Sequence, residues 1–382
     1  MQGTQKGKLV SASRNTTLWM LQRAYKARGL RLSYLSCRKR QDKNGREKGL
    51  LNIVGVDVGA TKIAAGVVSS EGEVLSRIRY PAANSRGGLL DTLTQAISEV
   101  SHGFEVDGVC LGVPGLVLAQ ENRVIFSPNL PAIEGIPLKD ELELRIGFPV
   151  TVENDNNAAA WGEFWFGAGS EAENLLFVGL GTGIGGGIVM HGQLVRGALG
   201  AAGELGHVTL QATGPRCACG NRGCLEAFAS GTAIGRRARE LAAEQPDSGL
   251  GQLAAEREVS GEDVTNLARE GDEAALSVLE EVGRWLGIGL AGFVNILNSE
   301  VVVVGGGVME AGELILKAAR REVHLRARSP SRELIEVKEA TLGPESGVIG
   351  GAALARGSAL RSTHRLVKPL THQPSRASGG LR

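Results

Sequence analysis

Two segments of the chain, residues 51–75 and 175–194, repeat one pattern, and this repeat constrains the fold more than any other feature. In each copy an apolar strand runs into a glycine-rich turn, a second apolar strand leaves it, and a further glycine turn leads to a third strand. Two such copies predict two related halves. Small residues leave backbone N–H groups open to phosphate oxygens, so we expect both halves to face one nucleotide.

The first glycine turn offers a phosphate site beside a carboxylate. Asp57 ends the strand that enters this turn, where it can hold Mg²⁺ directly or through water. The residues of this turn that we assign to phosphate binding are Gly59, Thr61 and Lys62. In the second copy they are Gly181, Thr182, Gly183 and Gly185. Either turn alone is a weak signal, since glycine turns are common in hairpins, but the pair at comparable offsets is a strong one.

A third glycine run follows the apolar strand expected at 301–304. A buried parallel strand that feeds a glycine turn lets a nucleotide base or ribose lie against the backbone. We therefore assign Gly305, Gly306 and Gly307 to nucleotide binding. The alternative is structural, because glycines also allow a strand to pack tightly against the following helix, expected here at about 312–327.

Four consecutive polar residues stand at a strand-to-helix corner. A strand at 149–153 is followed by Asn154, Asp155, Asn156 and Asn157, and then by a helix that runs toward Gly167. One of these residues is expected to cap the helix, which Asp and Asn do routinely. Four exceed what one cap requires. Because the carboxyl ends of strands in α/β proteins line ligand clefts, we expect Asp155 to project into such a cleft.

A cluster of one histidine and three cysteines predicts a metal site. Cys217, Cys219 and Cys224 are spaced Cys-x-Cys-x4-Cys, and His207 stands ten residues upstream. Three thiolates and an imidazole are a full tetrahedral set for Zn²⁺, with no position left for water, so the metal should be structural. The alternative is a set of reduced thiols or a disulfide. Nearby Gly220 and Gly223 favour the metal, because a chain that wraps an ion needs unusual backbone angles.

Two carboxylates, Glu204 and Glu226, bracket this cluster. The predicted zinc would hold them in place. Clustered cysteines beside a histidine, with Cys37 and Cys110 isolated, are typical of metal chemistry in a reducing compartment, so we expect a cytoplasmic protein.

Length and composition bound the domain organisation. A chain of 382 residues with 42% hydrophobic content is too large for one ordinary core and too apolar to be disordered. We expect a basic, disordered extension at 1–49, a small α/β domain of 50–170 plus 342–358, a large α/β domain of 171–341 that carries the zinc cluster, and a disordered basic tail at 359–382. Further helices are expected at 89–101, 236–244, 261–270, 273–298 and 343–357, and a buried strand at 107–112.

The charge is unevenly distributed along the chain. Residues 1–49 carry thirteen Lys and Arg against two acids, whereas the body is acidic and is a poor candidate for a nucleic-acid surface. Three interpretations of this extension remain open: an organelle transit peptide, a fragment of a DNA-binding arm, or a stretch upstream of the true start. No signal peptide is recognisable. The apolar stretch 285–297 is too short to span a membrane and predicts a buried helix.

Taken together, these motifs resemble the ROK family, which contains bacterial sugar kinases, chiefly glucokinases, and sugar-responsive repressors. The resemblance covers about residues 51–358. It rests on the glycine turns, on the corner at Asp155 and, most specifically, on the zinc motif. The family's fold is an actin-like, ribonuclease-H-like pair of α/β domains that close on ATP and sugar.

The resemblance implies roles for individual residues. Asp155 matches the family's catalytic base. Its hexose contacts match Asn154, Glu204, His207 and Glu226, with Asn129 as a further candidate, and His207 would also ligate zinc. The implied cofactors are structural Zn²⁺ and the Mg²⁺ that accompanies ATP. A homodimer or homotetramer is implied as well, with neither nucleic acid nor membrane as partner.

The implied activity is ATP-dependent phosphorylation of a hexose, with glucose favoured. Kinases of N-acetylmannosamine, N-acetylglucosamine or fructose remain alternatives. Polyphosphate is disfavoured as donor by the glycine run at 305–307. A different class, a sugar-responsive repressor, is supported only by the basic extension, which is too short for the complete winged helix that such repressors carry.

Overall fold

The computed structural model describes residues 40–41, 47–48, 52–83, 85–119 and 121–364. Most of the two segments expected to be disordered, namely 1–39, 42–46, 49 and 365–382, lies outside the described residues. Within the described part, β1 (Arg40–Gln41) and β2 (Glu47–Lys48) form a short antiparallel pair.

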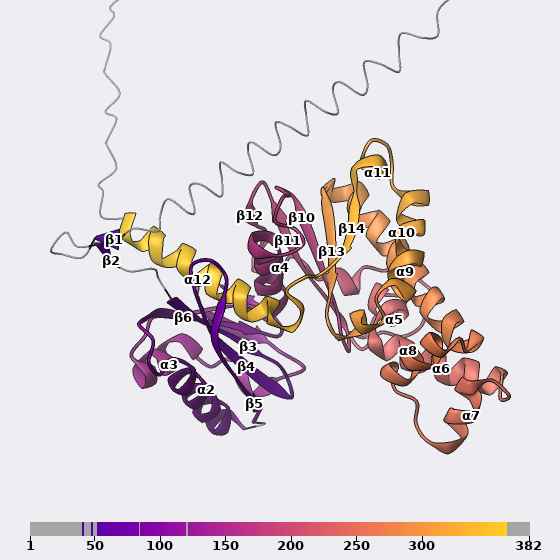
Figure 1. Cartoon of the computed structure of the whole chain (residues 1–382), viewed down its shortest axis with the longest axis horizontal. Coiled ribbons are helices and arrows are strands. Elements are labelled where there is room, and N and C mark those ends of the chain that lie inside the picture. The colour runs from indigo at the N-terminus through magenta and orange to yellow at the C-terminus, as the bar shows by residue number, and fades with distance from the viewer. Residues whose placement is uncertain (1–39, 42–46, 49–51, 84, 120, 365–382) are drawn as a thin grey trace, which may run out of the picture.

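The first half is built on a five-stranded sheet in the order β5-β4-β3-β6-β9 (Figure 1). Its strands are β3 (Asn52–Val58), β4 (Lys62–Val68), β5 (Val74–Pro81), β6 (Val106–Val113) and β9 (Val150–Asn154). Strands β3, β4 and β5 are antiparallel neighbours, whereas β6 and β9 run parallel to β3. A hairpin of β7 (Leu116–Leu118) and β8 (Arg123–Phe126) stands apart.

The second half repeats this topology. Its sheet has the order β12-β11-β10-β13-β14. The strands are β10 (Leu175–Leu180), β11 (Ile184–Met190), β12 (Gln193–Leu194), β13 (Val301–Gly305) and β14 (Glu336–Glu339). Three antiparallel strands are again extended by two parallel ones on the β10 side. The predicted pair of related α/β halves is confirmed.

Each sheet is buried on both faces, and alternate residues of one strand therefore belong to different cores. In β10, Leu176 and Val178 pack toward α9 (Glu273–Leu297), whereas Leu175 and Phe177 pack toward α4 (Asp155–Phe166). This period of two follows from the pleat of a strand. A strand covered on both faces reads as a continuous apolar run, as the valines of β13 do.

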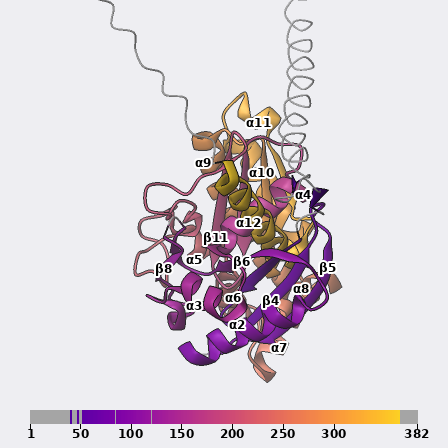
Figure 2. The ribbon, with the colours of Figure 1, turned by 90° about the vertical axis from the view of Figure 1, so that its left-hand side faces the viewer.

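Helices separate the two sheets and cover their outer faces. In the first half α2 (Arg86–Val100) and α3 (Leu138–Ile146) lie on one side, and α12 (Ser346–His364) lies on the side that faces the second half. Figure 2, in which the first half faces the viewer, shows α2 and α3 low and α12 above the strands. Helix α4 contacts both α12 and β11, so it lies between the sheets.

The second half is larger because more helices cover the outer face of its sheet. They are α5 (Leu225–Ala229), α6 (Gly231–Glu244), α7 (Gly249–Glu256), α8 (Gly261–Glu270), α9, α10 (Glu313–Arg326) and α11 (Ser331–Leu334). Short 3₁₀ turns occur at η1 (Pro131–Ile133), η2 (Leu205–His207), η3 (Gly307–Ala311) and η4 (Gly343–Glu345). Among the described residues no helix is both long enough and apolar enough to cross a membrane.

The chain passes between the halves twice, and one buried carboxylate accepts hydrogen bonds from both connecting segments. Glu163 of α4 is fully buried. Its side chain accepts hydrogen bonds from the backbone N–H of Ala168 at 2.8 Å, just after α4, and from those of Thr341 and Leu342 at 3.2 and 2.9 Å, between β14 and α12. Backbone donors thus satisfy a charge that would otherwise be costly to bury.

Most expected elements are present, with some differences. The helices at 261–270 and 273–298 end within a residue of their predicted bounds. The elements that were not predicted include α3, α11, β14 and the hairpin of β7 and β8. The last helix was expected to end near residue 357 but continues to His364, and 354–361 are rich in Ala, Leu and Arg, which favour helix.

Candidate functional site

Asp155 lies where two strand ends of the first sheet meet helix α4. Asn154 is the N-cap, because its side chain accepts from the N–H of Asn157 at 3.0 Å, so Asp155 is the first helical residue. Asp57 lies near the end of β3, opposite Gly112 of β6, and Gly112 is in turn opposite Glu153 of β9. The carboxyl ends of parallel strands thus bring the two aspartates to one edge of the sheet.

The two carboxylates influence each other. Burial, together with the nearby charge of Asp57, raises the pKa of Asp155 to about 7, against the lowering effect of the hydrogen bonds from Asn156. Burial also raises the pKa of Asp57, and Lys62 opposes that change. A carboxyl group with a pKa near 7 can accept a proton effectively at neutral pH.

Asn156 holds Asp155 in place and was not predicted as a functional residue. Its backbone N–H and its side-chain Nδ2 both donate to Oδ1 of Asp155, at 2.8 and 2.9 Å. A Cβ on Gly185 would lie 2.2 Å from this Nδ2, and one on Gly179 would lie 2.3 Å from Oδ1 of Asn156. Gly185, which was assigned to phosphate binding, therefore lies inside β11 and makes room for Asn156.

Two predicted sugar contacts differ in their surroundings. Asn154 is largely used by the protein itself, because its Oδ1 caps α4 and its Nδ2 donates to the carbonyl of Gly115 at 3.1 Å. One lone pair and one N–H bond of its side chain remain for a ligand. Asn129 is exposed in the turn 127–130 between β8 and η1.

The two predicted phosphate turns are exposed and similar in form. Gly59 donates its N–H to Lys62 O at 2.8 Å, and Gly181 donates to Gly183 O at 3.0 Å, so these two N–H groups close their own turns. This leaves the N–H groups of Ala60, Thr61, Thr182 and Gly183 as the candidates for the predicted phosphate contacts. The start of α6 supports the second turn, because Gly231 N–H donates to Gly181 O and Thr232 Oγ1 to Thr182 O, both at 2.8 Å.

The three glycines after β13 occupy different environments. Gly305 is buried against Phe177 and Ala340. Gly306 has a φ of +95°, and a Cβ there would lie 2.3 Å from the carbonyl oxygen of Leu180, so it requires glycine. Gly307 is exposed, and a Cβ there would meet no atom within 4 Å. Of the three, Gly307 offers open space beside the backbone.

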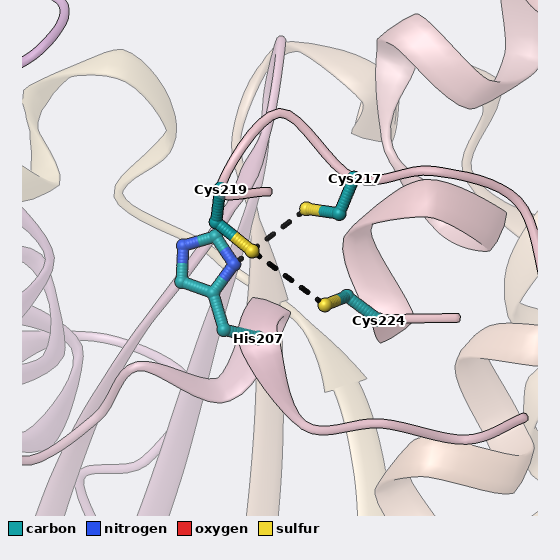
Figure 3. Close-up of side chains that lie close together, drawn as sticks. All are labelled: His207, Cys217, Cys219 and Cys224. Atoms are coloured by element: carbon teal, nitrogen blue, oxygen red, sulfur yellow. Dashed lines mark hydrogen bonds between the residues drawn. The ribbon is translucent and has the colours of Figure 1, made fainter. Parts of the chain in front are cut away.

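The predicted metal ligands converge from three segments (Figure 3). The ligand atoms of His207, Cys217, Cys219 and Cys224 lie within 4.8 Å of one another. His207 Nδ1 is 3.8 Å from Cys217 Sγ, and Cys219 Sγ is 3.8 Å from Cys224 Sγ. Two sulfur atoms on one tetrahedral zinc ion lie about 3.8 Å apart, given a Zn–S bond of about 2.3 Å, so these residues fit the ion.

The backbone around this cluster has the predicted character. Gly220 and Gly223 have φ values of +95° and +67°, and a Cβ on Gly223 would lie 1.6 Å from Gln211 O. Burial raises the pKa of the Cys217 thiol, whereas a backbone hydrogen bond involving Asn221 lowers that of Cys219. A zinc ion would stabilise all three thiolates and release their protons on binding.

Glu204 and Glu226 lie around the first residues of β11, as does Asn156. Glu226 Oε2 accepts from the N–H of Ile184 at 2.9 Å, and its Oε1 is 3.4 Å from Cys217 Sγ. Glu204 precedes η2, and His207 Nε2 lies 3.9 Å from Glu204 Oε2. The residues flanking Glu204 contact β11, since a Cβ on Gly186 would lie 2.3 Å from Leu205 Cδ1 and 2.8 Å from Gly203 O. The structure thus brings Asp155, Glu204 and Glu226 around one strand.

Comparisons with known proteins give a consistent result. The model of the ROK family matches residues 53–358. A glucokinase from Streptomyces coelicolor is 38% identical over 308 residues, which cover 79% of this chain and 97% of that protein. The xylose repressor of Bacillus subtilis is 32% identical over 307 residues, covering 79% of this chain and 76% of the repressor. Among solved structures, a ROK family glucokinase from Streptomyces griseus in complex with glucose and AMPPNP has a TM-score of 0.73 and 39% identity, covering 81% of this chain and 100% of that chain.

Proposed function

This chain belongs to the ROK family, and we propose from that premise that it is an ATP-dependent sugar kinase, with glucose as its principal substrate. The observation that supports this most is Asp155, a carboxyl group with a pKa of about 7. Asn156, which donates to this carboxyl group, packs against Gly179 and Gly185 on either side of the second glycine turn. The identity to a glucokinase over nearly all of that protein's length supports glucose as the sugar.

Asp155 acts as the general base. Its carboxylate accepts the proton of the sugar's 6-hydroxyl, whose oxygen forms a bond to the γ-phosphorus of ATP as the bond to the bridging oxygen breaks and ADP leaves. Asn156 fixes one carboxylate oxygen with two hydrogen bonds, so the other is available for the hydroxyl. Mg²⁺, for which Asp57 is the proposed protein contact, would neutralise phosphate charge.

The glycine turns hold the nucleotide. The N–H groups of Ala60, Thr61, Thr182 and Gly183, together with the Lys62 ammonium, offset the charge of the phosphate oxygens. The two turns follow equivalent strands of the two sheets, β3 and β10, and are proposed to bind the nucleotide from both halves. The adenosine is proposed to lie over Gly307, beside the backbone of Gly305 and Gly306.

The zinc ion has a structural role: it holds in place the residues proposed to contact the sugar. His207 would use Nδ1 for the metal and turn Nε2 toward Glu204 and the sugar, so each ring nitrogen has one partner. Once Cys217 is a thiolate on zinc it has no proton to donate, which leaves Glu226 Oε1 for a sugar hydroxyl. Asn154 and, from the first half, Asn129 complete the proposed contacts.

A hexose panel tests this function. Full-length protein with Mg-ATP is expected to phosphorylate glucose with a higher kcat/KM than fructose, N-acetylglucosamine or N-acetylmannosamine in an ADP-release assay. Asp155→Asn should abolish turnover while leaving glucose binding measurable by calorimetry. The proposal fails if none of the hexoses releases ADP above the rate without sugar.

A repressor is the second candidate, favoured by the similarity to the xylose repressor. It predicts sugar-dependent binding of DNA and no sugar-dependent release of ADP. Gel shift of total genomic fragments, with and without glucose or xylose, separates the two classes. The basic residues that would carry such binding lie at 1–49, almost wholly outside the described residues.

For the setting of the protein we propose a cytoplasmic homodimer or homotetramer, as the family membership suggests. Light scattering of the purified chain gives its mass in solution. A monomeric mass would contradict this assembly but would leave the proposed reaction unaffected.

A further inference from the structure

An ion pair joins the two halves beside the proposed base. Arg196 follows β12 of the second sheet, and Glu153 belongs to β9 of the first. Arg196 Nε and Nη2 lie 2.7 and 2.6 Å from Glu153 Oε2. Glu153 is only 3% exposed, so the counter-ion of a buried carboxylate in one half comes from the other half.

The other carboxylate oxygen of Glu153 supports the corner that carries Asp155. Oε1 accepts from the backbone N–H of Asn154 and from Nδ2 of Asn157, both at 3.1 Å. These residues flank Asp155, and Asn157 is 2% exposed. Movement of the Glu153 side chain would therefore disturb the first turn of α4 directly.

Arg196 also begins the loop that leads to Glu204. This loop is closed by a hydrogen bond from Ala202 N–H to Arg196 O at 3.1 Å. Gly200, with a φ of +79°, packs so closely on the first half that a Cβ would lie 2.2 Å from Val117 O. A Cβ on Gly203 would lie 2.6 Å from Gly186 O of β11. The loop therefore contacts the first half at one point and the second at another.

We propose that Arg196 is a positioning residue that couples the sugar-binding loop 196–204 to the helix that carries Asp155. This inference rests on the proposed function. Binding of a sugar against Glu204 sets the conformation of the loop. The charge-assisted contact of Arg196 Nε and Nη2 with Glu153 Oε2 transmits that conformation to the corner at Asp155. Removal of the guanidinium leaves Glu153 buried without its cation, and the corner must rearrange. A displacement of about 1 Å at the base costs roughly a hundredfold in rate.

The first test is kinetic. Arg196→Met in the full chain should lower kcat for glucose phosphorylation roughly 10- to 100-fold, with the KM for ATP within about twofold of wild type. Arg196→Lys should recover part of the loss, because an ammonium can make one of the two contacts. Arg237→Met is the matched control, since Arg237 pairs with Glu281 at 2.8 Å between α6 and α9, away from the site.

A double-mutant cycle tests whether Arg196 acts through Glu153. Glu153→Gln combined with Arg196→Met should cost no more in kcat than the worse single variant, because both remove the same coupling. Costs that multiply would overturn the proposal. So would a kcat of Arg196→Met within about twofold of wild type.

Hydrogen exchange decides the question without turnover. In the Arg196→Met protein, exchange should become faster in peptides covering 153–158 and 196–204 together, while the Arg237→Met protein should match wild type in both. Faster exchange in only one of these segments would overturn the coupling. If wild-type protein phosphorylates no hexose, the proposed function is lost, whereas this comparison still decides the role of Arg196.

Discussion

Glu226 accepts a hydrogen bond from the backbone N–H of Ile184 at 2.9 Å, which joins the helix after the zinc cluster to the second glycine turn. Glu226→Ala would leave that buried N–H without a partner, at a cost of about 1–3 kcal/mol. We expect kcat/KM for glucose to fall roughly 10- to 100-fold, because the variant also loses the carboxylate proposed to contact the sugar, and each factor of ten corresponds to about 1.4 kcal/mol. Steady-state kinetics checks this, with the exposed Glu258→Ala as control. An unchanged kcat/KM would remove Glu226 from the site.

Gly183→Ala should disturb the hydrogen bond between Ile184 N–H and Glu226 by a change in the glycine turn. A Cβ on Gly183 would lie 2.3 Å from Glu226 Oε2, so either the carboxylate or the turn must move. We expect at least a tenfold rise in the KM for glucose. Gly292→Ala is the control, because its Cβ would meet nothing within 4 Å on an exposed turn of α9, and it should stabilise the protein by about 0.5–1 kcal/mol. Equal effects of the two variants would contradict the steric argument.

The pH dependence should follow Asp155. The base must be ionised, so kcat/KM for glucose should rise with pH, reach half its plateau near pH 7, and fall about tenfold per unit below that. The sign for stability is opposite. Since the folded-state pKa lies above the usual value of 3.8, the contribution of Asp155 to stability is complete below that value and is lost as pH rises through about 7. A flat kinetic profile between pH 5.5 and 8 would exclude Asp155 as the base.

The affinity of the protein for zinc should depend on the exposed ligand Cys219. Cys219→Ser is expected to bind zinc more weakly and to raise the KM for glucose, because the metal holds the segment between Glu204 and Glu226. Cys110→Ala serves as control, since Cys110 is buried in β6 and lies in a different core. Elemental analysis after dialysis measures the metal. One zinc per chain in the Cys219→Ser protein, with an unchanged KM, would contradict the prediction.

Glu163 should be important for stability. Glu163→Ala leaves three backbone N–H groups without their shared acceptor, and we expect the free energy of unfolding to fall by about 3 kcal/mol or more. Urea titration followed by circular dichroism measures this. The exposed Glu270→Ala at the end of α8 should change it by less than about 0.5 kcal/mol. A loss for Glu163→Ala no larger than this would refute the assignment.

The repeat of glycine turns predicted more of the fold than any other sequence feature. A strand, a tight turn and a returning strand are local in sequence, and the two copies indicated two related halves, each with three consecutive antiparallel strands. The ligands of the zinc site were also readable, because their spacing is fixed by the metal. Strand β14 was not predicted, since its sequence Glu-Val-Lys-Glu has one apolar residue and is a strand only through pairing with β13.

Contacts between distant segments account for what was missed at the site. Asn156 was grouped with three polar neighbours, and its two hydrogen bonds to Asp155 and its close approach to Gly179 and Gly185 became visible only in the structure. Arg196 stands in a glycine-rich loop, and its partner Glu153 lies 43 positions away in the chain. Neither spacing nor periodicity records such a pairing, because it depends on how the two sheets are brought together.

The shared acceptor at Glu163 has a consequence for motion. If the two connecting segments had no contact in common, each could flex separately, and the two halves could then twist as well as open. Here both crossings are fastened to the same side chain at the far end of the helix that begins with Asp155. A rotation of one half against the other that keeps these hydrogen bonds would therefore be centred near Glu163, toward the end of α4 opposite to Asp155.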